Sequence, residues 1–511
     1  MQKLLDILRQ SEIYNSFISD INSSKSHLNI CGLGGSAVAF FLSALTDDLP
    51  DKTFLIITET HDDIDRLYHN LITFRDEDDI VLFPAWQTFL YGKISPAREI
   101  LSDRMFTLER LIHGKRSIII TSIRALLHKI LPVEAFKKAT LHFAIGKEIE
   151  LNEVIQSLIH SGYERVDIVE MKGDFSVRGG IIDIYPLTYE MPIRIELFGD
   201  EIDSIRYFDP ITQRSTTKID FDVWIVPMSE IILTPEMINY WKERTTEIIE
   251  TQQSSKLANE VKLLTEKLLE YGRFDGIEGY LPLLYKNLAD LWDYLPEDTI
   301  VIADDPQWLK NESEKLLDQA EQFFHSEQEK DNLVVSPQEI FTTFDKVLSF
   351  CESKKTIYIS RKKNEKYYDF GMKTMEGLRG NFQMFLKEIE NWVDSGYMVN
   401  IFSDNDKQAE RMRDILTERQ LGSVTVHIGS IDAGFICDNL MLSIISEDEM
   451  FGRYRKPIRR RKFKEGVPIS SFVDLKKGDY IVHISHGIGI YEGIEQLKVD
   501  GKPQDFIKIS Y

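Results

Sequence analysis

The sequence predicts an α/β protein of several domains, and three observations support that prediction. The chain has 511 residues, and at roughly 150 residues per domain this length predicts three or four domains. Short apolar runs rich in β-branched residues alternate with helical segments, which is typical of a parallel sheet with crossover helices. Between residues 146 and 224 the pattern changes to paired strands with tight turns, which predicts a small inserted α+β domain.

The first predicted domain is built from two separated segments. Residues 1–145 alternate between helices and buried strands, and residues 225–330 return to helical periodicity after the insertion. Buried strands are predicted in the apolar runs at 53–60, at 79–86, at the start of 117–132, and within 298–306. We therefore expect 225–330 to complete the domain that 1–145 begins.

The inserted domain, 146–224, is predicted to consist of β-hairpins. Residues 193–208 alternate between apolar and polar side chains, and Gly199-Asp200 stands at the reversal, which predicts a hairpin. Residues 174–186 form a second extended pair, interrupted by Gly179-Gly180.

The remainder of the chain is predicted to hold another α/β domain, a linker and a β-only segment. Residues 331–452 form the α/β domain, 453–470 the basic linker and 471–511 the β segment. Strands of the α/β domain are predicted at 356–360, 398–403, 423–429 and 440–446.

The composition favours a globular chain without a membrane span. Hydrophobic residues make up 43% of the chain and charged residues 28%, and no segment approaches the ~20 uninterrupted apolar residues that cross a bilayer. The N-terminus lacks the apolar core of a signal peptide. Cys31, Cys351 and Cys437 are too few and too far apart for a disulfide framework. We therefore expect a cytoplasmic protein with no membrane contact.

The formal net charge of −22 repels nucleic acid unless basic residues gather on one face. One segment opposes this trend, because 453–464 holds eight Lys or Arg in twelve residues. A solvated linker, a nucleic-acid contact and a contact with an acidic protein surface are all open interpretations of it.

The segment 27–45 has the layout of a phosphate-binding loop, in which a strand leads through glycines into a helix. The loop residues are Gly32, Gly34, Gly35 and Ser36. A working loop of the form GxxxxGK[ST] places a Lys against the phosphates, whereas here no Lys or Arg follows before Lys52. A helix N-terminus supplies only about half a unit charge. We therefore interpret the segment as a degenerate P-loop that keeps the strand-to-helix turn.

The same glycines leave a dinucleotide site open as an alternative. Ala37 stands where the G-x-G-x-x-G pattern has its last glycine, and the alanine variant of that pattern is known. Glu59 ends the next apolar run, where a ribose-binding acid would stand. These matches are weak, so a structural turn is the favoured interpretation.

The sequence holds no recognisable catalytic or metal-binding motif. Asp304 and Asp305 end a predicted strand where a magnesium-binding acid would stand, but without a Lys partner we expect helix-capping or solvated side chains. The four acids at 76–79 are consecutive and cannot all face one metal, which predicts an exposed loop. His483 and His486 are three apart on a predicted strand, so their side chains point to opposite faces. We expect no catalytic residue, metal or cofactor in this chain.

The segment 162–209 contains three strings that are specific in combination: Gly-Tyr-x-Arg, Arg-Gly-Gly-x-x-Asp-Ile-Tyr-Pro and Phe-Gly-Asp-Glu-Ile-Asp. They resemble the UvrA-binding domain shared by the excision-repair protein UvrB and the bacterial transcription-repair coupling factors. UvrB has an intact phosphate loop and a Tyr-rich hairpin, whereas here the loop lacks its Lys and the matching region, 83–105, is short. The chain therefore resembles the N-terminal region of the coupling factors. That implies a UvrB-like, RecA-like first domain with the UvrA-binding domain inserted.

The C-terminal end resembles the same family. Residues 475–511 are similar to the start of its RNA-polymerase-interacting domain, a Tudor-like β-barrel also seen in CarD-type regulators. In that family the full protein continues into a motor that uses ATP and Mg²⁺ to move along double-stranded DNA, and the motor's helicase motifs do not occur here. The resemblance implies a fragment that ends inside the barrel, with UvrA and the RNA polymerase β subunit as partners.

The family's UvrA-binding surface maps onto Arg178, Arg194 and Phe198, with Arg165 as a weaker neighbour. Strand alternation places Arg194 and Phe198 on one face, opposite Ile193. We expect one exposed Phe and two exposed Arg on a sheet face that burial does not require, and these residue types are favoured interface anchors. The alternative is a set of ordinary solvated positions with Phe198 partly buried at a turn.

The family's polymerase contact maps onto Leu497, with Ile494 and Lys498 nearby. An exposed strand edge there could pair with a strand of the polymerase β subunit. The alternative is that Leu497 fills the core of the barrel.

The expected function is a non-catalytic platform that recruits UvrA to stalled RNA polymerase in nucleotide excision repair. The alternatives are a UvrB-type, ATP-dependent module that binds damaged DNA and a DNA-binding module that uses Arg459, Arg460 and Arg461 of the basic segment. Nucleotide hydrolysis and salt-sensitive duplex binding distinguish them.

Overall fold

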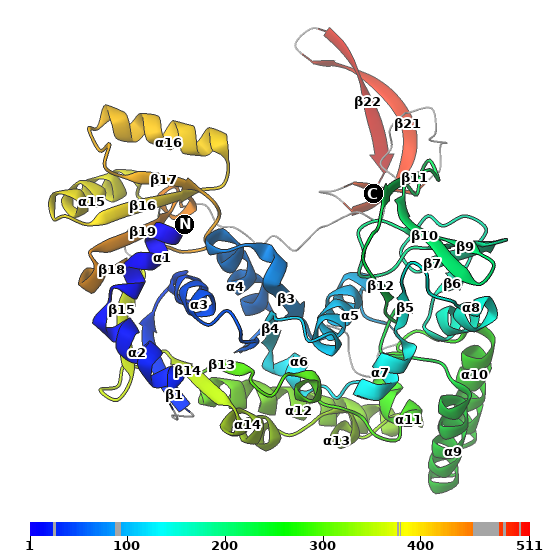
Figure 1. Cartoon of the computed structure of the whole chain (residues 1–511). Helices are drawn as coiled ribbons and strands as arrows, with labels where there is room; N and C mark the ends of the chain where they lie inside the picture. Colours follow the sequence, from blue (N-terminus) through cyan, green and yellow to red (C-terminus); the bar gives the residue numbers. More distant parts are fainter. Residues whose placement is uncertain are drawn as a thin grey trace.

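The structure is a computed structural model that describes residues 1–23, 27–86, 94–375, 378, 380–452, 480–483, 487–499 and 502–510. Figure 1 shows a large sheet flanked by helices and a smaller, separate sheet formed by the middle of the chain. The predicted α/β architecture with several domains is confirmed.

An eleven-stranded sheet forms the framework of the chain. Neighbouring strands are parallel except at β18, which is antiparallel to both of its neighbours. In spatial order the strands are β17 (Thr425–Ile428), β16 (Met398–Ser403), β19 (Leu442–Ser446), β18 (Phe435–Cys437), β15 (Tyr368–Lys373), β1 (His27–Leu33), β14 (Lys355–Ser360), β13 (Ile300–Asp304), β2 (Phe54–Thr58), β4 (Ile118–Ser122) and β3 (Ile80–Phe83). All the predicted strands of the large sheet are present, and β15 and β18 are additional.

Strand β2 illustrates why these sequences form a sheet that is covered on both sides. All of its residues are buried. Leu55 and Ile57 pack into the hydrophobic core on one face, and Phe54 and Ile56 pack into the core on the other. A strand buried on both faces is apolar throughout and does not alternate.

Helices from separate parts of the chain cover the two faces. The face that holds Phe54 is covered by α1 (Gln2–Arg9), α2 (Glu12–Asn22), α3 (Ala37–Asp48) and α4 (His61–Phe74). The opposite face is covered by α5 (Arg98–Ile112), α6 (Ile123–Leu127), α7 (Val133–Ala139), α12 (Pro306–Gln328), α13 (Pro337–Ile340) and α14 (Phe344–Ser353), joined by α9 (Pro235–Gln252), α10 (Ser255–Tyr271) and α11 (Leu281–Leu284). A third core packs α15 (Phe382–Asp394), α16 (Asp406–Glu418) and α17 (Glu447–Met450) against β16.

The large sheet continues across the predicted boundary at residues 330 and 331. Strand β14 lies in the 331–452 region, yet it pairs with both β1 and β13 of the first predicted domain. Strand β1 pairs on its other side with β15. The two predicted α/β segments therefore share one sheet, with the N-terminal strand inside the C-terminal half of it.

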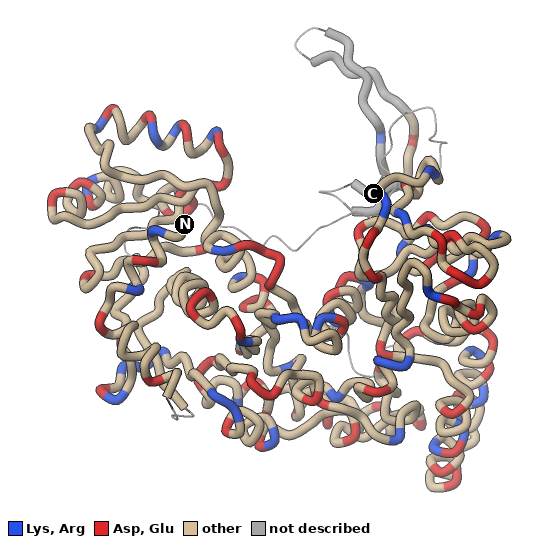
Figure 2. The backbone as a smooth tube through the Cα atoms, in the orientation of Figure 1, with Lys and Arg blue, Asp and Glu red and all other residues tan. Residues whose placement is uncertain are grey.

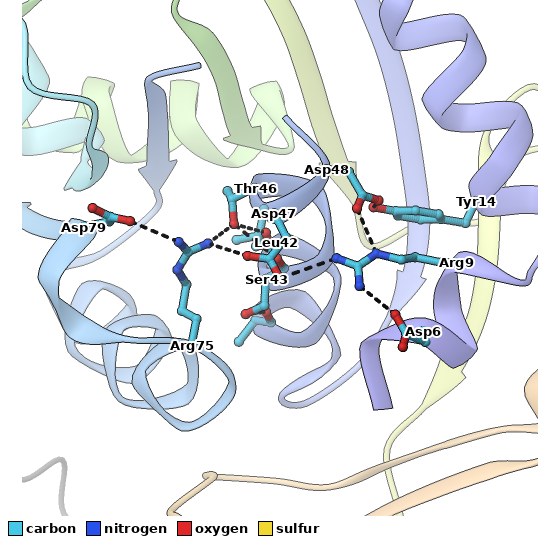
Figure 3. Close-up of polar contacts among 11 residues, drawn as sticks. Asp6, Arg9, Tyr14, Leu42, Ser43, Thr46, Asp47, Asp48, Arg75 and Asp79 are labelled. Atoms are coloured by element: carbon cyan, nitrogen blue, oxygen red, sulfur yellow. Dashed lines mark hydrogen bonds and ion pairs between the residues drawn. The ribbon is translucent and has the colours of Figure 1, made fainter. Parts of the chain in front are cut away.

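A polar cluster holds the two N-terminal helices to the end of α3 (Figure 3). Arg9 Nε donates to Asp48 Oδ1 at 2.8 Å, and the Tyr14 hydroxyl donates to Asp48 Oδ2 at 2.6 Å. Arg75 lies 3.7 Å from Asp47 on the other side of the helix. The helix dipole disfavours carboxylates at a helix C-terminus, so Arg9 and Arg75 offset an unfavourable local charge.

The inserted domain has its own sheet and its own core. Its six strands lie in the order β11 (Ser215–Lys218), β10 (Glu201–Phe208), β9 (Ile193–Phe198), β8 (Ile181–Ile184), β7 (Asp174–Arg178) and β6 (Glu164–Arg165), and α8 (Leu151–His160) packs beneath them. The two ends of the insertion meet where β5 (Leu141–Phe143) pairs with β12 (Val223–Ile225). The middle of the chain therefore combines a sheet with a helix around a core of its own.

Two glycine turns set the hairpins of this sheet. Gly179 has φ +60° between β7 and β8, and Gly199 has φ +67° between β9 and β10. A positive φ is strained for other residues, so these glycines fix the reversals where the sequence predicted them. The register that follows places Arg194 opposite both Asp183 and Arg206.

The C-terminal strands form a separate three-stranded sheet. Strand β21 (Gly487–Val499) is central, between β20 (Tyr480–His483) and β22 (Lys502–Ser510). Pairing is antiparallel on both sides. Across the described ranges, no helix combines the length and apolarity needed to cross a membrane.

Candidate functional site

Strand β9 separates an apolar face of the inserted sheet from a polar one. Ile193 and Ile195 are fully buried in the core, whereas Arg194 and Phe198 project from the opposite face. Phe198 is 83% exposed, so the alternative in which it is partly buried is wrong. A large aromatic side chain that gains nothing from burial is a candidate contact residue.

Arg194 is not the freely exposed cation that the sequence predicted. Its Nε donates to Asp183 Oδ1 at 2.7 Å and its Nη2 donates to Asp183 Oδ2 at 2.9 Å, with only 17% of its side chain exposed. The guanidinium also lies 4.8 Å from the centroid of the Phe208 ring. The hydrogen bonds to Asp183 raise the pKa of Arg194. Because buried Asp183 needs a partner, the pair holds Arg194 against the sheet.

Arg178 remains exposed at the end of β7, as predicted. Its Nε lies 3.4 Å from Ser176 Oγ, and its Nη2 donates to the carbonyl of Asp167. Its strand neighbour on β8 is Ile181, which is 38% exposed. Arg178 is therefore oriented by the backbone while its charge remains accessible.

These side chains belong to one surface, the polar face of the inserted sheet. We define it by Ser176, Arg178, Ile181, Asp183, Arg194, Glu196, Phe198, Ser204 and Arg206. The Ser204 hydroxyl donates to Glu196 at 2.7 Å, and Arg206 Nε is buried without a hydrogen-bond partner. The sequence pattern placed Glu196 on this face between Arg194 and Phe198, but it did not indicate the other members, which are Ser176, Ile181, Asp183, Ser204 and Arg206. Asp183 carries a signal, because it is the one polar residue of β8.

The turn from β1 to α3 keeps the layout of a phosphate loop but uses its amides within the protein. The N–H of Gly34 donates to the carbonyl of Met372 at 2.9 Å, and the N–H of Ser36 donates to the carbonyl of Ala433 at 2.9 Å. The Ser36 hydroxyl is buried without a partner. The Ala433 carbonyl thus accepts a hydrogen bond from an N–H at the helix N-terminus, a group that in a working phosphate loop would donate to the anion.

The loop glycines are needed for close packing. Gly35 has φ +60°, and a Cβ there would stand 2.7 Å from the carbonyl oxygen of Gly434. A Cβ on Gly34 would stand 3.0 Å from Thr374. Glu59, the candidate ribose-binding acid, forms an ion pair with Arg361 at 2.9 Å. These contacts agree with a structural turn.

The acids at the end of β13 have different roles. Asp305 accepts the N–H of Gln307 at 3.0 Å and caps α12, so the predicted helix cap is confirmed. Asp304 instead accepts the N–H of Glu59 at 3.1 Å, and burial raises its pKa to about 6. The prediction of a capping or solvated side chain is therefore wrong for Asp304, because its strand end is enclosed by the turn after β2.

The four acids at 76–79 are exposed, and Glu77–Asp79 form a short 3₁₀ helix. Within the part of the chain that the structure describes, no group of three or more His, Cys, Asp or Glu is arranged to hold a metal ion. The basic segment 453–464, including its three consecutive arginines, lies outside the described residues, as does His486.

The residues predicted for the polymerase contact lie in β21. Ile494, Leu497 and Lys498 pair with Ile507, Gln504 and Pro503 of β22. On its other edge β21 pairs with β20 only from Gly487 to Ile490, so among the described strands none flanks that edge at Leu497. The side chains of these residues lie outside the described part, and their roles stay predictions.

Comparison with protein families finds two matches along the chain. The UvrB interaction domain matches residues 141–230, which is the inserted domain with its closing strands. The CarD-like/TRCF RID domain matches residues 475–511.

Comparison with curated proteins gives matches of much greater extent. The transcription-repair-coupling factor of Bacillus subtilis (strain 168) is 27% identical and aligns with all of this chain. That of Staphylococcus aureus (strain MRSA252) is 30% identical over 90% of this chain. The chain is related to the transcription-repair-coupling factors. The resemblance seen in the sequence is thereby confirmed. The inserted domain, which carries the polar face, is the part of this chain that matches the UvrB interaction domain.

The chain spans less than half the length of these relatives. Its matches cover 46% of the Bacillus subtilis coupling factor and 41% of the Staphylococcus aureus one.

Proposed function

We propose that this chain is the non-catalytic, N-terminal part of a transcription-repair coupling factor acting in the cytoplasm in nucleotide excision repair. It recruits UvrA through the polar face of the inserted sheet and contacts the RNA polymerase β subunit through 475–511. The observation that carries this proposal is Phe198, an 83% exposed aromatic side chain on the face that holds Arg178.

The chemistry of the polar face suits a protein partner. Ile181 and Phe198 offer apolar area, and Arg178 offers a guanidinium that the backbone of Asp167 orients. Aromatic and Arg side chains dominate the binding energy of protein interfaces. The Arg194–Asp183 pair stiffens the centre of this face, which reduces the entropy lost on binding.

Capture of UvrA by the immobilised chain tests the proposal. We expect Arg178→Ala and Phe198→Ala each to weaken binding by about 1–3 kcal/mol, the range of exposed hot spots. Phe221→Ala is the matched control, because Phe221 is 58% exposed in the same domain but lies off the polar face. Unchanged capture by a double variant of Arg178 and Phe198 would overturn the assignment of this face.

The non-catalytic part of the proposal rests on the degenerate P-loop. Its residues offer no cation, and the N–H groups of Gly34 and Ser36 are already donated to carbonyls. We expect no ATP hydrolysis by this chain, with ATP, Mg²⁺ and double-stranded DNA used by the rest of the full-length protein. Hydrolysis by the purified chain, lost in a variant of the loop, would favour the UvrB-type alternative.

The polymerase contact is supported by the edge of β21 opposite β22, along which no described strand lies near Leu497. An added strand of the β subunit could pair there through main-chain hydrogen bonds. Lys498 pairs with Pro503, which has no N–H, so the main chain of Lys498 faces this edge and that of Leu497 faces β22. We expect Lys498→Pro to reduce capture of a β-subunit fragment while UvrA capture is unchanged.

A further inference from the structure

A groove runs along the outer edge of the inserted sheet, beside β7. Its volume is about 800 Å³, and it is lined by Arg165, Val166, Asp167, Ile168, Ser176, Val177 and Arg178. Only Ser176 and Arg178 of these belong to the polar face, so most of the groove is a separate feature.

The groove exists because β6 is too short to cover β7. Strand β6 consists of Glu164 and Arg165 and pairs only with Asp174 and Phe175. The carbonyl of Phe175 accepts the N–H of Val166 at 2.9 Å, and there the pairing ends. Among the described strands none covers the rest of β7, which therefore leaves a sheet edge unpaired.

The backbone of Val177 faces this open edge. Main-chain groups of successive strand residues point to opposite sides. Phe175 faces β6, so Ser176 and Arg178 face β8, with which β7 is paired, and Val177 faces the groove. No described residue has a hydrogen bond to the Val177 backbone from that side.

The walls of the groove favour an acidic segment with apolar residues. Arg165 and Arg178 are exposed on its sides, and Asp167 supplies one opposing charge. Ile168 is 51% exposed at the rim. Figure 2 shows acidic and basic residues interspersed along the described elements, and the whole chain has a net charge of −22. The lining of the groove, with two Arg and one Asp, has instead an excess of positive charge. Such a surface attracts anionic partners.

We propose that an extended, acidic segment of a partner protein adds to the edge of β7 as a further strand. Its main chain pairs with the N–H and carbonyl of Val177, its carboxylates meet Arg165 and Arg178, and an apolar side chain covers Ile168. This is the strand-addition mode, in which main-chain hydrogen bonds give affinity and flanking pockets give specificity. The inference rests on the proposed function, with UvrA as the partner that supplies the segment.

A proline substitution isolates the main-chain contact. Val177→Pro removes the N–H that faces the groove while leaving the pairing of β7 with β8, since proline is tolerated at an open edge. Val177→Ala is the matched control, because it shortens the side chain and keeps the N–H. We expect Val177→Pro to weaken UvrA capture at least tenfold and Val177→Ala to change it less than threefold.

Amide hydrogen exchange on the unaltered chain covers the case in which the proline variant fails to fold. We expect the Val177 amide to exchange at least tenfold more slowly when UvrA is bound. Tight UvrA binding with unchanged Val177 exchange would overturn the strand-addition inference and leave the proposed function standing. Failure of the unaltered chain to bind UvrA would overturn the proposed function itself.

Discussion

Arg194 and Phe198 stand four residues apart on one face of β9, yet they contribute differently. Phe198 is exposed and makes no contribution to the core. Arg194 neutralises Asp183, which is 6% exposed. A buried carboxylate without its partner is costly, so the Arg194 side chain supports the fold as well as the polar face.

We predict that Arg194→Ala destabilises the inserted domain by about 2–4 kcal/mol, because it leaves the charge of Asp183 uncompensated. Arg178→Ala is expected to change stability by less than about 1 kcal/mol, because Arg178 is exposed. Urea titration with hydrogen exchange of the β8 and β9 amides as the readout measures both changes in the free energy of unfolding.

Removing both partners of the Asp183–Arg194 pair shows how much of the lost stability comes from the uncompensated charge and how much from lost side-chain packing. The double variant Asp183→Ala with Arg194→Ala should be less destabilised than the sum of the single variants. Additive effects would show that the pair does not act as a unit. A binding defect of Arg194→Ala alone therefore cannot be assigned to a lost contact with a partner.

The sequence predicted the face of Arg194 but not its environment. Strand alternation needs only neighbouring residues, so the exposure of Phe198 and the position of Arg178 were predictable. The pairing with Asp183 depends on the register between β8 and β9, which are joined through a loop at 185–192. That register is set by the turn and the packing of the whole sheet.

At the scale of elements, the C-terminal end of α3 brings four segments together. Arg9 and Tyr14 reach it from α1 and α2, and Arg75 reaches it from the end of α4 (Figure 3). Burial raises the pKa of Tyr14, so its hydroxyl remains a donor to Asp48. Asp48 thus links both N-terminal helices to the end of α3 through hydrogen bonds, in addition to their apolar packing.

We predict that Asp48→Ala loosens α1 and α2 by about 1–2 kcal/mol, because two hydrogen bonds are lost and their donors are left partly buried. Hydrogen exchange of the α1 amides should become about tenfold faster for each 1.4 kcal/mol of lost stability.

Asp47→Ala is the control. Its contacts to Arg9 and Arg75 are 3.4 and 3.7 Å long, so we expect an effect below about 0.5 kcal/mol. Equal effects of the two variants would contradict the role given to Asp48.

Elements with a strong apolar pattern were predicted, and elements stabilised only by their neighbours were not. Strands β2, β13 and β19 have continuous buried residues that need no partner to be recognised. Strand β15 contains Gly371 and polar residues, and β18 has three residues. These two become strands because β1 and β19 supply their hydrogen bonds.

At the scale of the whole molecule, the sheet order could not be derived from the sequence. Strand β1 lies between β14 and β15, which follow it by more than 300 residues. The predicted segments 1–330 and 331–452 each look complete as α/β patterns, because periodicity reports local structure only. The inserted domain differs, since its strands pair mainly with their neighbours in sequence.

This difference predicts how fragments of the chain behave. A fragment of residues 140–233 contains the whole core of the inserted domain and the β5–β12 pair that joins its ends, so we expect it to unfold cooperatively in urea as a single domain.

A fragment of residues 1–330 lacks both strands that flank β1 and leaves the residues packed against β1 without part of their core. We expect that fragment to show no cooperative transition for β1 and to expose its amides to rapid exchange. Protected β1 amides in the 1–330 fragment would contradict the continuity of the sheet as the source of its stability.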